Sequence, residues 1–172
     1  MKFLWAPWRM DYILEGKKGG CIFCRKPQEG RDRKNLILHR GDHGFVMMNK
    51  FPYNNGHLMI IPNRHCLDLE DLREGETREL FRLMRAATHV LKETLHPQGF
   101  NIGMNVGKAG GAGEDHLHVH IVPRWAGDTN FMPILGGTKI IPQYLEETYK
   151  TLCRGFRDFL RKASGRKGGM GP

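Results

Sequence analysis

At residues 116–123 the chain reads HLHVHIVP, in which three histidines alternate with apolar residues. Residues two apart in a β-strand project from the same face, so this stretch predicts a strand with all three imidazoles on one side. Its apolar side chains, Leu117, Val119 and Ile121, would enter the core. Three imidazoles on one face suit two chemistries. They can ligate a metal ion, or one can act as nucleophile or base while its neighbours orient it and bind the charge of a substrate.

A glycine-rich loop, residues 107–113, leads directly into this strand and holds four glycines in seven residues. Glycine lets backbone amides approach an anion closely, and successive amides can form an anion-binding nest. Next to a row of imidazoles, such a loop predicts phosphate chemistry. The candidate nucleotide-binding positions in it are Gly107, Gly111 and Gly113.

The rest of the chain predicts a small α+β domain. Short apolar runs bounded by turn residues indicate four more strands, and apolar spacings of three and four indicate two helices. Hairpin-length links on both sides of the first helix favour an antiparallel sheet over a doubly wound parallel one. The expected strands are 35–39, 44–48, 56–62, 99–106 and 116–123, and the expected helices are 76–96 and a final helix that starts near Pro142.

The length of 172 residues suits one domain with a segment of different character at each end. Residues 1–34 are rich in Lys, Arg, Gly and turn formers, and they predict an irregular arm that contains a Cys-x-x-Cys clip. Residues 35–162 would form the folded domain. Residues 163–172, which read ASGRKGGMGP, predict a disordered basic tail.

Charge and cysteine content exclude several classes of protein. The formal net charge is +9, of which +5 lies in residues 154–172, so the body of the chain is only mildly basic. This balance suits an anionic ligand such as a nucleotide and does not require nucleic acid. Four cysteines are too few for a secreted disulfide scaffold, and no apolar run approaches the roughly 20 residues that span a bilayer. We therefore expect a cytoplasmic protein without a membrane or nucleic-acid partner.

Cys21 and Cys24 have the spacing of half a tetrahedral zinc site. A redox dithiol is an alternative, but no predicted strand precedes the pair in the way a thioredoxin-like βαβ unit requires. A pair of free thiols is the other alternative. Cys153 falls on the predicted final helix and suits the core.

Together these motifs resemble the histidine-triad superfamily of nucleotide hydrolases and transferases. Its signature is His-φ-His-φ-His-φ-φ, where φ is apolar, and residues 116–122 match it in full. The resemblance runs from about Cys21 to the final helix and includes Asn49, the segment GHLMIIP at 56–62, and Asn105.

Within the superfamily, the chain looks like the bacterial diadenosine tetraphosphate phosphorylase branch. The segments that carry this likeness are LWAPWRM at 4–10 and PRWAGDTNF at 123–131. The third triad position is His120 where the galactose-phosphate uridylyltransferase branch has glutamine, which argues against a sugar-nucleotide transferase. The chain departs from its relatives at residues 112–115, which read AGED where a Gln, Ser or Thr often precedes the triad. Phosphate contacts there would come mainly from backbone amides.

The resemblance implies a role for each candidate residue. His118 would attack the α-phosphorus and form a nucleotidyl-histidine intermediate, and His120 would bind the phosphate oxygens. His57 would support the orientation of the triad. Asn49 would contact the ribose, and Asn105 would contact the ligand near the phosphates.

The resemblance also implies a structural zinc ion and no organic cofactor. Many relatives complete a Cys-x-x-Cys clip with two histidines, which gives the ligand set Cys21, Cys24, His65 and His116. If His116 is a ligand, the catalytic pair within the triad reduces to His118 and His120. Cys66 is a possible substitute for His65.

The implied enzyme is a homodimer with an intersubunit sheet that cleaves the α-phosphate linkage of a nucleotide or dinucleoside polyphosphate. The branch resemblance predicts inorganic phosphate as acceptor, so that diadenosine tetraphosphate is converted into ATP and ADP. The alternative enzyme is a hydrolase of dinucleoside polyphosphates or nucleoside phosphoramidates, because only the group that attacks the intermediate differs. A nucleotide-binding regulatory module and a metal-dependent hydrolase with three histidines on zinc are further alternatives.

Overall fold

The computed structural model describes residues 20–128 and 143–165. The expected start of the final helix at Pro142 and the segment at 4–10 lie outside these ranges. The helices are α2 (Ile22–Gln28), α3 (Asp32–Asn35), α4 (Glu74–Leu95) and α6 (Leu145–Gly165). The strands are β1 (Ile37–Arg40), β2 (Gly44–Met48), β3 (Leu58–Pro62), β4 (Gly99–Met104) and β5 (Val119–Arg124).

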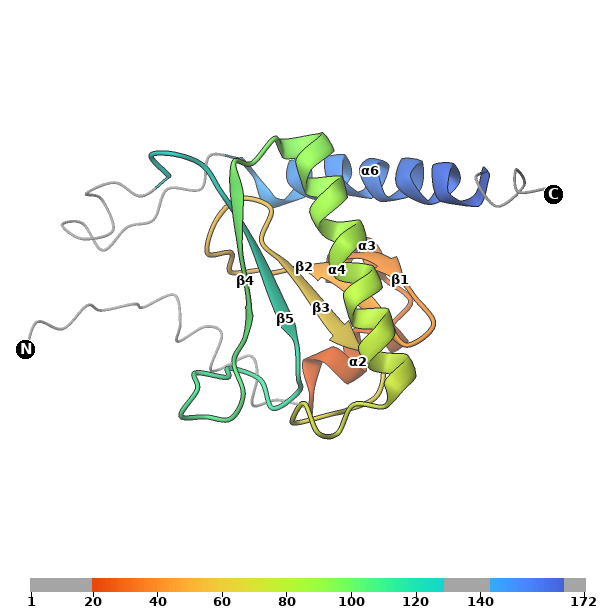
Figure 1. Cartoon of the computed structure of the whole chain (residues 1–172), viewed down its shortest axis with the longest axis vertical. Helices are drawn as coiled ribbons and strands as arrows, with labels where there is room; N and C mark the ends of the chain where they lie inside the picture. The colour runs from red at the N-terminus through yellow and green to blue at the C-terminus, as the bar shows by residue number, and fades with distance from the viewer. Residues whose placement is uncertain (1–19, 129–142, 166–172) are drawn as a thin grey trace, which may run out of the picture.

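The strands form one five-stranded sheet in the order β1-β2-β3-β5-β4, and every pairing in it is antiparallel. Consecutive strands β1, β2 and β3 lie side by side. Helix α4 then crosses the sheet, and β5 returns between β3 and β4 (Figure 1). This arrangement confirms the predicted α+β fold with an antiparallel sheet.

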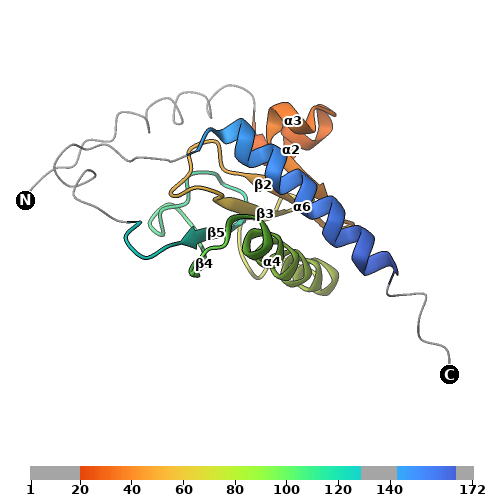
Figure 2. The same ribbon diagram turned by 90° about the horizontal axis from the view of Figure 1, so that it is seen from above.

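Side chains that alternate along the strands fill two apolar cores, one on each face of the sheet. The core on the face that α4 and α6 cover contains Val46, Met48, Leu58, Ile60, Val119 and Ile121. The core on the opposite face contains Phe45, Met47, Met59 and Ile61, together with Phe23 of α2. Figure 2 shows α4 and α2 on opposite sides of the sheet. The sheet is therefore the middle layer, and α2 covers the face that α4 does not.

Helix α4 confirms the predicted first long helix to within two residues at either end. Its apolar positions pack on the sheet because they recur every three or four residues. The Glu76 carboxylate accepts the backbone N–H of Arg73 at 2.8 Å and so satisfies a donor at the start of the helix. His96 ends the helix in a left-handed conformation (φ 49°), immediately before Pro97.

Three expectations are corrected by the structure. Part of the segment expected to be irregular forms α2 and α3, and α2 is held on the sheet because Phe23 buries its ring in the core on the face opposite α4. Helix α6 continues through Gly165, so residues 163–165 of the expected disordered tail are helical, and residues 166–172 lie outside the described ranges. Strand β5 begins at Val119, so His116 and His118 precede the paired part of the strand.

In the part of the chain that the structure describes, no helix has both the length and the apolar content needed to cross a membrane.

Candidate functional site

Two triad histidines lie on the face of the sheet that α2 covers. Val119 and Ile121 belong to the core on the α4 side, so His118 and His120, which alternate with them, project the other way. The ring centroids of His118 and His120 are 4.6 Å apart, and the ring planes meet at 74°. The predicted alternation is confirmed for this pair. We call His118, His120 and His57 the histidine cluster.

His57 joins the cluster from the turn before β3, and its side chain is fully buried. Its Nε2 lies 2.9 Å from Nδ1 of His120. The backbone N–H of Tyr53 donates to Nδ1 of His57 at 3.1 Å. Because Nδ1 of His57 accepts that bond, the ring proton of neutral His57 sits on Nε2 and is donated to His120. Neutral His120 therefore carries its own proton on Nε2, the nitrogen that does not face His57.

His118 has the opposite tautomer. Its Nδ1 lies 2.7 Å from the carbonyl oxygen of His116, and a carbonyl can only accept, so Nδ1 carries the proton. The lone pair of the neutral ring is therefore on Nε2. The two neighbouring rings thus offer an unprotonated nitrogen on His118 and an N–H donor on His120.

Burial keeps both rings neutral at pH 7. It lowers the pKa of His118 below the usual value of 6.5. Burial, together with electrostatic repulsion from a protonated His118, lowers the pKa of His120 to about 4. A neutral imidazole is the form that can act as a nucleophile, so the geometry and the protonation state agree.

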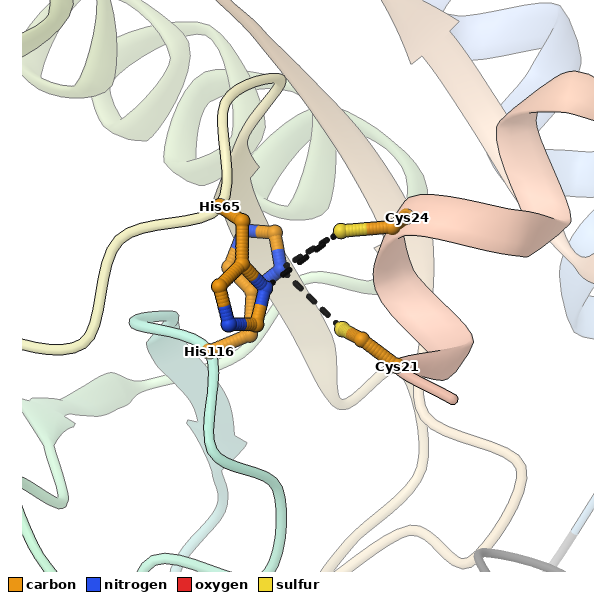
Figure 3. A group of neighbouring side chains, drawn as sticks. All are labelled: Cys21, Cys24, His65 and His116. Carbon is orange, nitrogen blue, oxygen red and sulfur yellow. Dashed lines mark hydrogen bonds between the residues drawn. The ribbon is translucent and has the colours of Figure 1, made fainter. Parts of the chain in front are cut away.

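His116 turns away from the histidine cluster and toward α2. Its Nε2–H donates to the carbonyl oxygen of Pro62 at 3.1 Å, which leaves the Nδ1 lone pair directed at the thiols of Cys21 and Cys24. Figure 3 shows the two cysteines of the α2 region pointing at the imidazoles of His116 and His65. The predicted ligand set is therefore brought together from α2, the β3–α4 connection and the segment just before β5.

The geometry of this group fits a tetrahedral zinc ion. Its four ligand atoms all lie within 4.8 Å of one another. Sγ of Cys21 is 3.2 Å from Nδ1 of His116, and Sγ of Cys24 is 3.4 Å from Nδ1 of His65. A tetrahedral site with ordinary Zn–S and Zn–N bond lengths places sulfur and nitrogen about 3.6 Å apart. Burial, and the neighbouring Cys21 thiol, raise the pKa of Cys24 to about 11, so two thiolates here need a cation beside them.

The other two cysteines lie apart from this group. Cys66 is buried and is not among the four clustered residues, so the possible substitution of Cys66 for His65 is not favoured. Cys153 packs at the edge of the core on the α4 side, as its place on the final helix predicts.

Asn49 lies at the edge of the histidine cluster. Its backbone N–H donates to the carbonyl of His57 at 3.0 Å, and its side-chain oxygen accepts the N–H of Phe51 at 2.9 Å. Asn105 is partly exposed at the end of β4, with its amide nitrogen 3.5 Å from the carbonyl of Gly111. Asn49 is thus positioned by its backbone bond to His57 in the turn before β3, and Asn105 by the glycine-rich loop.

The glycine-rich loop is folded on itself. Gly107 and Gly111 have positive φ angles of 68° and 87°, and a Cβ on Gly110 would lie 2.3 Å from the carbonyl oxygen of Val106. The N–H groups of Gly110 and Ala112 donate to the carbonyl of Gly107, and that of Gly111 donates to Lys108. The glycines therefore serve first to make the turn, and the Gly111 amide is engaged within the loop in this conformation.

Two aromatic residues of the site are absent from the sequence-based candidates. Phe23 is buried, with 3% of its surface exposed. Its ring centroid is 5.0 Å from that of His118 and 5.8 Å from that of His116. Tyr53 is half exposed, and its ring centroid lies 4.7 Å from that of His57 and 5.8 Å from that of His120. The position of Phe23 between the two cysteines of the clip was the available signal for it.

Polar contacts hold the turn that carries Tyr53 and His57. The amide of Asn54 donates to the carboxylate of Asp128 at 2.8 Å and to the carbonyl of Pro123 at 3.1 Å. The hydroxyl of Thr148 on α6 donates to the side-chain oxygen of Asn55 at 2.9 Å. The end of β5 and the start of α6 thereby fix the position of the His57 turn.

Comparisons with known proteins agree with this geometry. The family described as the HIT domain matches residues 31–127. An AP-4-A phosphorylase from Mycobacterium tuberculosis is 42% identical over 160 residues, which cover 87% of this chain and 82% of the relative. A bis(5'-nucleosyl)-tetraphosphatase [asymmetrical] from Schizosaccharomyces pombe is 32% identical over 92 residues, which cover 54% of this chain and 50% of the relative.

Among solved structures, a Zn-bound histidine triad family protein from Mycobacterium smegmatis is similar to this chain with a TM-score of 0.67 and 25% identity. The similarity covers 84% of this chain and 97% of that protein.

Proposed function

Since the chain belongs to the histidine triad (HIT domain) family, we propose that it is a nucleotidyl-transfer enzyme that acts on dinucleoside polyphosphates. The substrate we propose is diadenosine tetraphosphate, with inorganic phosphate as acceptor and ATP and ADP as products. The single observation that carries the proposal is the bond from Nδ1 of His118 to the carbonyl of His116, because it leaves the Nε2 lone pair of a neutral ring for attack. The similarity to the mycobacterial AP-4-A phosphorylase supports the choice of substrate.

In the first half-reaction, Nε2 of His118 attacks the α-phosphorus and forms an N–P bond. The bond from the α-phosphorus to the bridging oxygen breaks, its electron pair stays on that oxygen, and ATP leaves. The Nε2–H of His120 donates to the phosphate oxygens, where charge develops in the transition state. His57 keeps that proton on Nε2 of His120, because the Nε2–H of His57 donates to Nδ1 of His120.

In the second half-reaction, an oxygen of inorganic phosphate attacks the α-phosphorus of the adenylyl group on His118. The N–P bond breaks, its electron pair returns to Nε2 of His118, and ADP forms. We propose Asn49 as the ribose contact and Asn105 and the glycine-rich loop, with Gly107, Gly111 and Gly113, as the polyphosphate contacts. The backbone bond from Asn49 to His57 and the contact of Asn105 with the loop that leads to the triad support these roles, and the Gly111 amide would have to leave its bond to Lys108 to contact a phosphate.

Product analysis with diadenosine tetraphosphate tests the proposal. Incubation with and without inorganic phosphate is followed by chromatography of the nucleotides. We expect ATP and ADP that form only when phosphate is present. AMP and ATP at a rate that does not depend on phosphate would assign the chain to the hydrolases instead, the class of the fission-yeast relative. Binding without turnover would indicate a regulatory nucleotide-binding module.

We also propose that Cys21, Cys24, His65 and His116 hold a structural zinc ion. The ion would tie α2 to the β3–α4 connection and to the start of β5. Within the described part of the chain, His116 is the only triad histidine in the metal-fitting group, which disfavours a hydrolase that uses all three on zinc. Metal analysis of protein purified without added zinc tests this site. About one equivalent per chain is expected, and less than about 0.2 equivalents with no loss of stability in chelator contradicts the proposal.

The edge strand β4 supports a homodimer with a sheet that continues between subunits. Phe100 packs into the core on the α4 side, so Ile102 and Met104, two and four residues on, lie on the same face. These two residues are 50% and 38% exposed. An edge strand with exposed apolar residues is suited to pair with a second copy. The four cysteines are unpaired, which suits the cytoplasm as the proposed location.

A further inference from the structure

We propose that Phe23 positions the nucleophilic ring of His118 and makes its orientation depend on whether the Cys21–Cys24–His65–His116 site holds a metal ion. The inference rests on the proposed function, because it assigns His118 the role of nucleophile. It goes beyond that function in giving the metal site an effect on the chemistry.

The first physical link is His116, which belongs to both sites. Its Nδ1 faces the thiols of Cys21 and Cys24, while its carbonyl oxygen accepts the Nδ1–H of His118 at 2.7 Å. The Nε2–H of the same ring is held by the carbonyl of Pro62. A metal ion on Nδ1 therefore fixes the residue whose carbonyl sets the tautomer of the nucleophile.

The second link is Phe23, which lies in sequence between the two cysteine ligands. Its ring meets that of His116 edge-on at 85° and that of His118 at 56°. The Phe23 ring is almost fully buried and belongs to the core on the face of the sheet opposite α4. Any shift of Cys21 or Cys24 must therefore move a ring that forms part of the wall around His118.

Helix α2 has little stability of its own. It has seven residues and includes Pro27, whereas isolated helices shorter than about 12 residues are marginal in water. The position of its N-terminal end, which carries Cys21, Phe23 and Cys24, therefore depends mainly on the packing of Phe23 and on the four metal-fitting ligands. With zinc bound, both restraints act. Without zinc, α2 is held by the packing of Phe23, by the thiol–imidazole contacts, and by the Asn35 and Arg40 side chains that donate to the carbonyls of Lys26 and Pro27, so the cysteine end loses its strongest restraint.

The experiment compares zinc-loaded and zinc-free protein in the wild type and in Phe23→Leu. Leucine keeps an apolar side chain at this position but removes the ring that touches both histidines. Phe156→Leu is the matched control, because Phe156 is equally buried but lies in the core on the α4 side. Three quantities are measured: zinc stoichiometry, the NMR signal of the His118 Nδ1–H proton, and the single-turnover rate of adenylyl transfer to His118.

In the wild type we expect zinc removal to broaden the His118 Nδ1–H signal and to slow adenylyl transfer about ten-fold or more, with a smaller change in KM. Phe23→Leu should still bind one zinc ion, since all four ligands remain, yet show the broadened signal and the slow transfer. Zinc removal should then slow Phe23→Leu less than it slows the wild type, because one restraint is already lost. Phe156→Leu should lose stability but keep both the signal and the rate.

The proposal is overturned if wild-type protein binds zinc and its removal changes neither the proton signal nor the transfer rate. It is also overturned if Phe23→Leu behaves like Phe156→Leu, or if no zinc binds. Failure of the proposed function looks different: zinc-loaded wild type then forms no adenylyl adduct on His118, while the proton signal still reports on the coupling. If Phe23→Leu does not fold, zinc titration of the wild type, followed by the proton signal, decides.

Discussion

Replacement of Glu76 by glutamine should remove a defined part of the pH dependence of folding stability. Glu76 anchors the connection between β3 and α4, which also carries the zinc candidate His65. Its carboxylate accepts two bonds from the Arg64 guanidinium, at 2.9 and 2.7 Å, and a third from the backbone N–H of Arg73 at 2.8 Å. The Glu76 side chain is only 7% exposed, so these bonds are largely shielded from water.

The magnitude follows from the pKa of this carboxyl group. The bonds from Arg64, with the N–H of Arg73, lower the pKa of Glu76 from 4.5 to about 2. A shift of that size corresponds to at most about 3 kcal/mol of folding free energy. The Arg64 side chain is 36% exposed, so solvent screening reduces the expected value to about 2 kcal/mol. Because the pKa is lower in the folded state, this stabilisation is complete above pH 4.5 and is lost as the pH falls toward 2.

Urea unfolding of the wild type and of Glu76→Gln between pH 3 and pH 7 measures the effect. The difference in unfolding free energy should be about 2 kcal/mol at pH 7 and should shrink at pH 3. If the proposed site holds zinc, its loss at low pH affects both proteins and cancels in the difference. Glu74→Gln is the matched control, because the ion pair of Glu74 with Arg78 is largely exposed, so its loss should change little. If the difference in unfolding free energy between the wild type and Glu76→Gln stays constant from pH 7 to pH 3, the reasoning is refuted.

Three further predictions concern the active site and the assembly. His118→Ala should form no covalent adduct and lose turnover by several orders of magnitude while nucleotide binding, measured by calorimetry, persists; unchanged turnover contradicts the covalent mechanism. His57→Ala should lower kcat about ten-fold, because the tautomer of His120 is no longer held, whereas His57→Gln keeps an N–H donor and should recover part of the rate; equal losses in both variants argue against this role. Ile102→Asp should convert the proposed dimer to monomer in sedimentation analysis, and Leu69→Asp, at a similarly exposed leucine, should not; a dimer that survives Ile102→Asp excludes β4 as the interface.

The main strands and the first long helix were predictable because their apolar residues follow patterns that are typical of one kind of element. The short apolar runs of β2 and β3, bounded by turn residues, and the three- and four-residue spacing of α4 each indicate one kind of element. Helices α2 and α3 carry no such signal. The first has a single buried residue, Phe23, and its proline and basic residues resemble those of a loop. It is helical because the sheet provides a place for that ring.

The histidine alternation correctly placed His118 and His120 on one face of the strand. It did not predict that His116 turns away from them toward the cysteines. The same spacing suits all three rings, and the chain leaves the paired strand before Val119, which lets His116 turn toward the cysteines. For the loop before the triad, the glycine content indicated backbone freedom. The sequence did not predict that several of the loop's backbone amides bond within the loop, because these bonds depend on the turn that the loop adopts.

By itself the sequence determined which chemical groups are present and that His118 and His120 share one face of the last strand, because side-chain alternation is a local property of an extended chain. It also determined the antiparallel α+β class through the order and lengths of its elements. Only the tertiary structure decided the state of each histidine. A carbonyl accepts from His118, the Tyr53 amide donates to His57, and the cysteines approach His116 from a segment 95 residues away. These partners are distant or depend on the turns of the chain, and they select which nitrogen carries the proton.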